Sequence, residues 1–122
     1  MRYRTFGRLD WQPSALGFGM MRLPIRENDP GQIDELLATQ MLRYAIERGV
    51  NYVDTAYGYH RGNSEAFVGR ALQDGYRQRV RLATKLPCWL VKEQDDFDRY
   101  LNEQLQRLQT ERVDFYLLHA LN

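Results

Sequence analysis

The stretch VNYVDTAYGYHRGNSEAFVGRAL, residues 50–72, decides the fold. Residues 50–54 are rich in the Val and Tyr that favour a strand. Asn63 and Ser64 are good N-caps for a helix, and Glu65 suits its first turn. The apolar face of that helix falls on Phe67, Val68, Ala71 and Leu72. The stretch therefore predicts a strand, a loop and a helix that ends near residue 75.

The same order of elements extends in both directions along the chain. We expect further strands at residues 15–19, 80–85 and 113–118, helices at 33–48 and 93–109, and a short hairpin over 2–9. Four strands alternating with three helices predict an α/β fold with parallel strands, in repeats of roughly 30–35 residues. Both a doubly wound sheet and part of a (βα)8 barrel fit this pattern.

Apolar residues at helical spacing predict which faces of the outer helices are buried. In the helix at 33–48 this stripe is Leu37, Met41 and Ala45, with Leu42 and Ile46 beside it. In the helix at 93–109 the predicted stripe is Phe97, Leu101, Leu105 and Leu108.

Length, charge and cysteine content narrow the class of protein. The chain has 122 residues, and 17 Lys plus Arg against 16 Asp plus Glu give a net charge of +1. Near-neutrality gives no reason to expect nucleic acid or an anionic membrane as a partner. No apolar run approaches the ~18 residues of a membrane span, and no secretory leader is visible. The single cysteine, Cys88, fits a reducing cytoplasm.

Four side chains that can handle protons fall where predicted strands end. Asp54 and Lys85 close two of the strands, His119 follows the last one, and Tyr59 lies in the loop after Asp54. The carboxyl ends of parallel strands share one edge of the sheet, where active sites gather. A single polar residue there is usually a loop cap. A group of four, drawn from only two lysines and two histidines, favours an active site.

This set of groups suits the reduction of a carbonyl. A phenol is a weak acid, with a pKa of about 10, and a neighbouring ammonium lowers that value. A carboxylate beside the ammonium keeps it charged and oriented, and the phenol becomes a general acid. An imidazole at the same edge can orient a carbonyl by a hydrogen bond.

Several segments resemble the aldo-keto reductase family. The stretch NYVDTAYGY at 51–59, followed by NSE at 63–65, is similar to the family signature around its catalytic Asp and Tyr. Three other segments resemble its first strand, its lysine and its histidine: LGFGMMRLP at 16–24, ATK at 83–85 and YLLH at 116–119. RLP at 22–24, KLP at 85–87 and LHALN at 118–122 are most similar to the bacterial branch that appends a ferredoxin-like iron–sulfur segment.

The resemblance implies a role for each of the four side chains. Tyr59 rather than Tyr57 matches the general acid, and Lys85 would favour its deprotonated form. Asp54 would pair with Lys85, and His119 would orient the carbonyl.

The resemblance also implies NADPH as the source of hydride and a small-molecule carbonyl as the substrate. Gly19, Met20 and Met21, together with Asp54, would lie near the nicotinamide. Tyr59 and His119 would contact the substrate, and Trp89 would form a wall of its pocket, although a packing tryptophan is an equally good interpretation. An iron–sulfur cluster is expected only if a further segment follows residue 122.

Three other features indicate no ligand site. The GFG at 17–19 is half of a dinucleotide fingerprint, but Arg22 breaks the pattern. His60 is interpreted as a loop residue. Cys88 has no second ligand at metal spacing, so no metal site is predicted.

The family fold is a (βα)8 barrel of roughly 250 residues. We therefore expect residues 1–122 to be a single unit, the N-terminal half of such a barrel, truncated after the fourth strand. The isolated chain is expected to be weakly active or inactive. Three interpretations remain open: the first part of a longer reductase, a pair of half-barrels that cover each other, and a non-catalytic binding or scaffold module that self-associates.

Overall fold

A computed structural model describes residues 1–121 and contains one parallel sheet with the strand order β1-β2-β3-β4. The strands are β1 (Phe18–Gly19), β2 (Tyr52–Asp54), β3 (Arg81–Pro87) and β4 (Phe115–His119). Gly19 pairs with Asp54, Asp54 with Ala83 and Ala83 with Phe115. The predicted four parallel strands are confirmed, although β1 is shorter and β3 is longer than expected.

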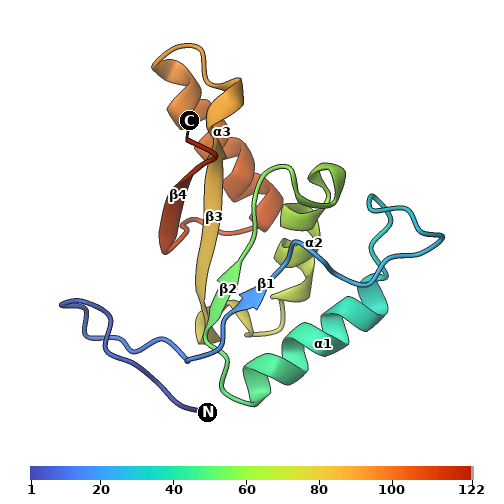
Figure 1. Ribbon diagram of the computed structural model, residues 1–122, viewed down its shortest axis with the longest axis vertical. Helices are drawn as coiled ribbons and strands as arrows, with labels where there is room; N and C mark the ends of the chain where they lie inside the picture. Colours follow the sequence, from blue (N-terminus) through green and yellow to red (C-terminus); the bar gives the residue numbers. More distant parts are fainter. Residues whose placement is uncertain (122) are drawn as a thin grey trace.

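Three α-helices connect the strands: α1 (Glu35–Glu47), α2 (Ser64–Ala71) and α3 (Asp95–Leu108). They lie side by side, α1 against α2 and α2 against α3, along one face of the sheet (Figure 1). Short 3-10 segments follow β2, precede β3 and follow β3: η1 (Tyr59–Gly62), η2 (Arg77–Arg79) and η3 (Cys88–Leu90). This arrangement is half of a (βα)8 barrel, as predicted.

The hydrophobic core fills the space between the sheet and the helices. The residues of β2 and β3 that point towards the helices, Val53 and Leu82, are fully buried there. The helices and the end of β1 contribute Leu42, Phe67, Val68, Leu108 and Met20. The predicted apolar face of α2 is confirmed, because all four of its members are buried.

The main predicted stripe of α1 is wrong by one position, whereas Leu42 and Ile46, predicted beside it, are confirmed as buried. Leu37 and Met41 are 46% and 43% exposed, whereas Ala38, Leu42 and Ile46 are buried. The apolar arc of this helix is wider than its contact with the sheet, and α1 packs against one neighbouring helix, α2. Its other flank therefore faces solvent.

The predicted stripe of α3 is displaced in the same way, except that Leu108 is confirmed as buried. Phe97 is 48% exposed, and Leu101 and Leu105 are half-buried. The buried positions are Asp96, Tyr100, Gln104 and Leu108. This helix packs against α2 and β3 through a face that carries polar side chains with hydrogen-bond partners. Its apolar flank is left beside the edge of the sheet.

The expected hairpin over 2–9 forms with different arms. Residues around Tyr3 run antiparallel to residues around Ser14, joined by an isolated bridge. The Arg4 N–H donates to the Pro13 carbonyl at 3.0 Å, and the Ala15 N–H donates to the Arg2 carbonyl at 2.7 Å. Aromatic rings in the segment between these arms explain why the arms differ from the predicted ones.

The N-terminal segment that carries two of those rings lies beside the lower end of the sheet, on the side away from the helices (Figure 1). The ring centroids of Phe6 and Trp11 lie 5.6 and 5.9 Å from that of Phe115, and the Tyr52 ring lies 5.5 Å from it. Burial of this aromatic cluster holds the N-terminal segment across the sheet. A tight turn does form within residues 2–9, where the Leu9 N–H donates to the Phe6 carbonyl at 3.1 Å, but it joins no pair of strands there.

The remainder of the open face and the outer edge of β4 are uncovered. Leu117 and Leu118 of β4 are 41% and 55% exposed. No helix within residues 1–121 is long and apolar enough to cross a membrane.

Candidate active site

The four side chains predicted at the strand ends gather on the open face, at the carboxyl ends of the strands. Asp54 and His119 are the last residues of β2 and β4, and Tyr59 begins η1. Lys85 lies two residues before the end of β3, rather than at the end itself. The longer strand leaves Pro87 opposite His119 in the register.

The Lys85 ammonium joins three of the elements. Its Nζ donates to both carboxylate oxygens of Asp54, with 2.8 Å to Oδ2, to the Thr55 carbonyl at 2.8 Å, and to the Tyr59 hydroxyl oxygen at 3.1 Å. The Lys85 side chain is 13% exposed. An ammonium has three protons, so these acceptors satisfy it completely and hold it in place beside the phenol.

Tyr57 and Tyr59 lie two residues apart and point to different places. The Tyr57 hydroxyl donates to Glu103 of α3 at 3.1 Å, and the Arg107 guanidinium lies 4.2 Å from the centre of its ring. Burial, and then the negative charge of Glu103, raise the pKa of Tyr57. Tyr59 is thus the phenol that lies beside Lys85.

The His119 ring stands beside Tyr59 and Trp89. Their ring centroids lie 5.9 and 5.2 Å from that of His119, both in edge-to-face geometry. Burial, and then the positive charge of Lys85, lower the pKa of His119. The imidazole is therefore neutral at pH 7 and can donate or accept one hydrogen bond. Trp89 is 55% exposed and borders the same open face.

The residues predicted to contact a cofactor divide between the two faces of the sheet. Gly19 pairs with Asp54, and the space that a Cβ at Gly19 would occupy is empty to 4 Å. Met21 is 58% exposed. The Met20 side chain is fully buried in the helix-side core, so only its backbone lies at this edge, and its place near the nicotinamide stays a prediction. The alternation of side chains along an extended chain explains why neighbouring residues separate.

His60 serves as a loop residue. It is buried, its Nε2 accepts from the Leu23 N–H at 3.1 Å, and its Nδ1 lies 2.7 Å from the Pro30 carbonyl. Nδ1 therefore carries the proton and donates to Pro30. This imidazole joins the loop after β1 to η1. Among residues 1–121, no cluster of His, Cys, Asp or Glu could hold a metal ion.

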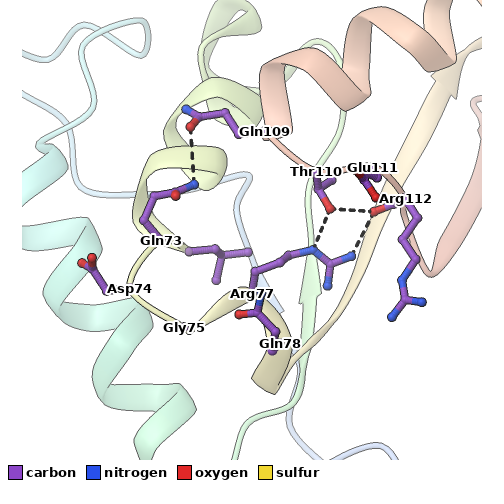
Figure 2. A pocket seen from close by; sticks show the side chains of 10 residues that line it. Gln73, Asp74, Gly75, Arg77, Gln78, Gln109, Thr110, Glu111 and Arg112 are labelled. Carbon is purple, nitrogen blue, oxygen red and sulfur yellow. Dashed lines mark hydrogen bonds between the residues drawn. The ribbon is translucent and has the colours of Figure 1, made fainter.

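A hollow lies at the amino ends of the strands, away from the four side chains, between the loop before β3 and the loop before β4 (Figure 2). Its main cation, Arg77, already donates to Thr110, to the Arg112 carbonyl at 2.9 Å and to Asp114. A guanidinium with these partners joins the two loops and has little capacity left for a ligand. We therefore place the candidate site at the carboxyl ends.

Two buried polar residues near the site were missed by the sequence analysis. Glu65 is fully buried although it was interpreted as a first-turn acid, and Gln104 is fully buried in α3. Gln104 lies four residues after Tyr100 and four before Leu108, both buried. That spacing is the signal that could have placed it in the core.

Comparisons with known proteins show which proteins the chain is similar to. The family model for the "Aldo/keto reductase family" matches residues 15–122. The "Uncharacterized oxidoreductase YqkF" of Bacillus subtilis is 37% identical over 98% of this chain and 39% of its own length. The "NADH-specific methylglyoxal reductase" of Escherichia coli is 30% identical over 98% of this chain and 42% of its own.

A solved aldo-keto reductase from Klebsiella pneumoniae in complex with NADPH superimposes with a TM-score of 0.76 at 31% identity, over 91% of this chain and 37% of that one. The chain spans about two-fifths of the length of the curated relatives that it matches. These comparisons do not show the iron–sulfur segment of the bacterial branch, which stays a prediction.

Proposed function

The chain belongs to the aldo/keto reductase family, and on that premise we propose that its Asp54–Tyr59–Lys85–His119 cluster reduces the carbonyl of a small aldehyde or ketone to an alcohol. One observation carries the proposal: a single ammonium contacts a carboxylate, a backbone carbonyl and a phenol on the open face.

Tyr59 is the proton donor of the proposed reaction. Its hydroxyl gives a proton to the carbonyl oxygen, and the Lys85 ammonium at 3.1 Å stabilises the phenolate that remains. Asp54 and the Thr55 carbonyl keep that ammonium in place. General acid catalysis of this kind contributes about 10²- to 10⁴-fold to the rate.

His119 and Trp89 orient the substrate. The neutral imidazole donates a hydrogen bond to the carbonyl oxygen, which directs that oxygen towards Tyr59. The exposed indole of Trp89 forms an apolar wall beside it. Two aromatic rings in contact with His119 favour a compact substrate whose carbonyl enters between them.

NADPH, when bound, supplies the hydride. Gly19, Met21 and Asp54 form an open edge beside Lys85 that fits a flat ring, because Gly19 presents no Cβ and Met21 is exposed. The backbone of Met20 belongs to the same edge, since its N–H donates to the Asp54 carbonyl at 2.8 Å. The Klebsiella relative binds NADPH, whereas the Escherichia relative is NADH-specific, and we favour NADPH for this chain.

We expect the whole protein to act in the cytoplasm. The isolated chain is expected to be a poor catalyst. It supplies four strands of the barrel and one side of the cofactor site. Its uncovered face and the exposed Leu117 and Leu118 also support the alternative of a self-associating binding or scaffold module. That module needs neither Tyr59 nor Lys85, so partner binding that survives replacement of both would favour it.

The test uses the protein expressed from its intact gene, with small aldehydes and NADPH carrying deuterium on the transferred position. We expect deuterium on the carbinol carbon of the product. Lys85→Met is expected to lower kcat by about 10²-fold or more, and the matched control Lys92→Met, at an exposed position, is expected to change it little. Equal activity of the two variants would contradict the proposed role of Lys85.

A further inference from the structure

A buried polar cluster lies directly behind Lys85, on the helix side of the sheet. It consists of Glu65 of α2, Thr84 of β3, Gln104 of α3 and Tyr116 of β4. Glu65, Thr84 and Gln104 are fully buried. The proposed reaction uses none of them, and buried polar side chains of this kind destabilise a fold unless they are hydrogen-bonded. The cluster therefore needs an explanation of its own.

The Gln104 amide is the centre of this cluster. Its Nε2 donates to Glu65 Oε1 at 2.9 Å and to the backbone carbonyl of Lys85 at 2.9 Å. Its Oε1 accepts from the Tyr116 hydroxyl at 2.6 Å. A carbonyl can only accept, so the amide nitrogen must face Lys85. Burial, and then the charge of Glu65, raise the pKa of Tyr116 to about 12, which keeps that hydroxyl a donor.

The Lys85 carbonyl requires a side-chain donor because β2 ends before it reaches the level of Lys85. The last residue of β2, Asp54, lies opposite Ala83, and the Ala83 carbonyl accepts from the Thr55 N–H at 2.9 Å. Backbone groups two residues apart on a strand point to the same side. The Lys85 carbonyl therefore points past the end of β2, where Gln104 takes the place of the missing strand.

We infer that Gln104 is a positioning residue, which holds the backbone of Lys85 so that its ammonium reaches Asp54, Thr55 and Tyr59 together. The side chain of Lys85 leaves one face of the sheet and the Gln104 amide approaches from the other. A shift of the carbonyl moves Nζ away from the 3.1 Å contact with the phenol. The effect of Gln104 on catalysis rests on the proposed function, whereas the claim that Gln104 fixes the position of Lys85 does not.

The rival explanation is that Gln104 only stabilises the core. Tyr116→Phe separates the two explanations, because it removes a hydrogen bond to the same amide and leaves the bond to the Lys85 carbonyl intact. Both Tyr116→Phe and Gln104→Met are expected to lower stability. Only Gln104→Met is expected to release the Lys85 ammonium.

The chain has two lysines, so NMR of protein labelled only in lysine gives two sets of side-chain signals, one for each lysine. Lys92 is exposed and serves as an internal reference. In the unaltered chain we expect two separate Hε signals for Lys85, because its ammonium is fixed. Gln104→Met is expected to merge them and to move them towards those of Lys92, whereas Tyr116→Phe leaves them apart.

Gln104→Asn provides a second variant that keeps a polar group in the core but shortens the reach to the Lys85 carbonyl. We expect the same merging of the Lys85 signals. Unchanged Lys85 signals in either folded Gln104 variant would overturn the inference, and so would equal changes in Tyr116→Phe. This readout needs no turnover, so its result stands whether or not the protein reduces carbonyls.

The intact protein adds a kinetic test if it is an active reductase. We expect Gln104→Asn to lower kcat about tenfold or more with KM within about twofold, because misplacement of a catalytic group slows the chemical step. Tyr116→Phe is expected to keep kcat within about twofold. A larger fall in kcat for Tyr116→Phe than for Gln104→Asn would contradict the positioning role of Gln104.

Discussion

Gly69→Ala is expected to destabilise the chain, although intrinsic helix propensity predicts the reverse. Gly69 lies inside α2, where Ala is normally favoured by about 1 kcal/mol. A Cβ at this position would lie 2.6 Å from the Arg107 carbonyl oxygen and 2.8 Å from the carbonyl carbon of Leu108. Both atoms belong to the backbone of the last turns of α3, so no side chain can rotate away from the added methyl group.

The size of the effect follows from these two opposing contributions. The helices α2 and α3 must separate by several tenths of an ångström. Because the blocking atoms are backbone, the cost falls in the upper part of the range for overpacking, at about 2–3 kcal/mol. The gain in helix propensity offsets part of that cost, which leaves a net loss of about 1–2 kcal/mol in the free energy of unfolding. For a chain of this length the melting temperature should fall by about 4–8 °C.

Urea unfolding, followed by the fluorescence of Trp11 and Trp89, measures this difference at constant m. Gly19→Ala is the matched control, because its Cβ would meet nothing within 4 Å. We expect that control to change stability by less than about 0.5 kcal/mol. A Gly69→Ala variant as stable as the unaltered chain, or more stable, would refute the close approach of α2 and α3.

Two further predictions concern stability and association. Asp114 accepts hydrogen bonds from the Leu82 N–H and from Arg77 and Arg81, which outweigh its burial and lower its pKa. Its contribution is therefore complete above pH ~4 and is lost as the pH falls through the lowered value. Asp114→Asn should cost about 2–3 kcal/mol at neutral pH and progressively less as the pH falls below ~4; a loss in urea unfolding that does not shrink as the pH is lowered would contradict this. The unaltered chain should self-associate in light scattering and Leu118→Glu should reduce this, because Leu118 is 55% exposed; a stable monomer at high concentration would argue against it.

The alternation of strands and helices was predictable because each element carries its own local signal. The chain positions of Asp54, Tyr59, Lys85 and His119 are read directly from the sequence, and parallel strands place their carboxyl ends together. The contact of Lys85 with three acceptors could not be derived in this way, because it depends on how far β3 extends beyond β2.

The burial of particular helix faces was harder to predict. Periodicity identifies an apolar arc but not which part of it meets a neighbour. Leu42, Ile46 and Leu108 were therefore predicted correctly, whereas the other buried positions of α1 and α3 lie one residue away from the predicted stripes. Gln104 and Glu65 are polar, and single-residue preferences place such side chains outside. Their burial depends on partners in three other elements, which no local pattern contains.

The central claim is that Tyr59 donates the proton in carbonyl reduction. The most direct measurement compares the kcat of Tyr59→Phe with that of Tyr57→Phe in the protein expressed from its intact gene. Tyr59→Phe removes the hydroxyl that lies 3.1 Å from Lys85, whereas Tyr57→Phe removes one that donates to Glu103. The account predicts a fall of about 10²- to 10⁴-fold for the first variant and less than about threefold for the second. Undiminished turnover by Tyr59→Phe would contradict it.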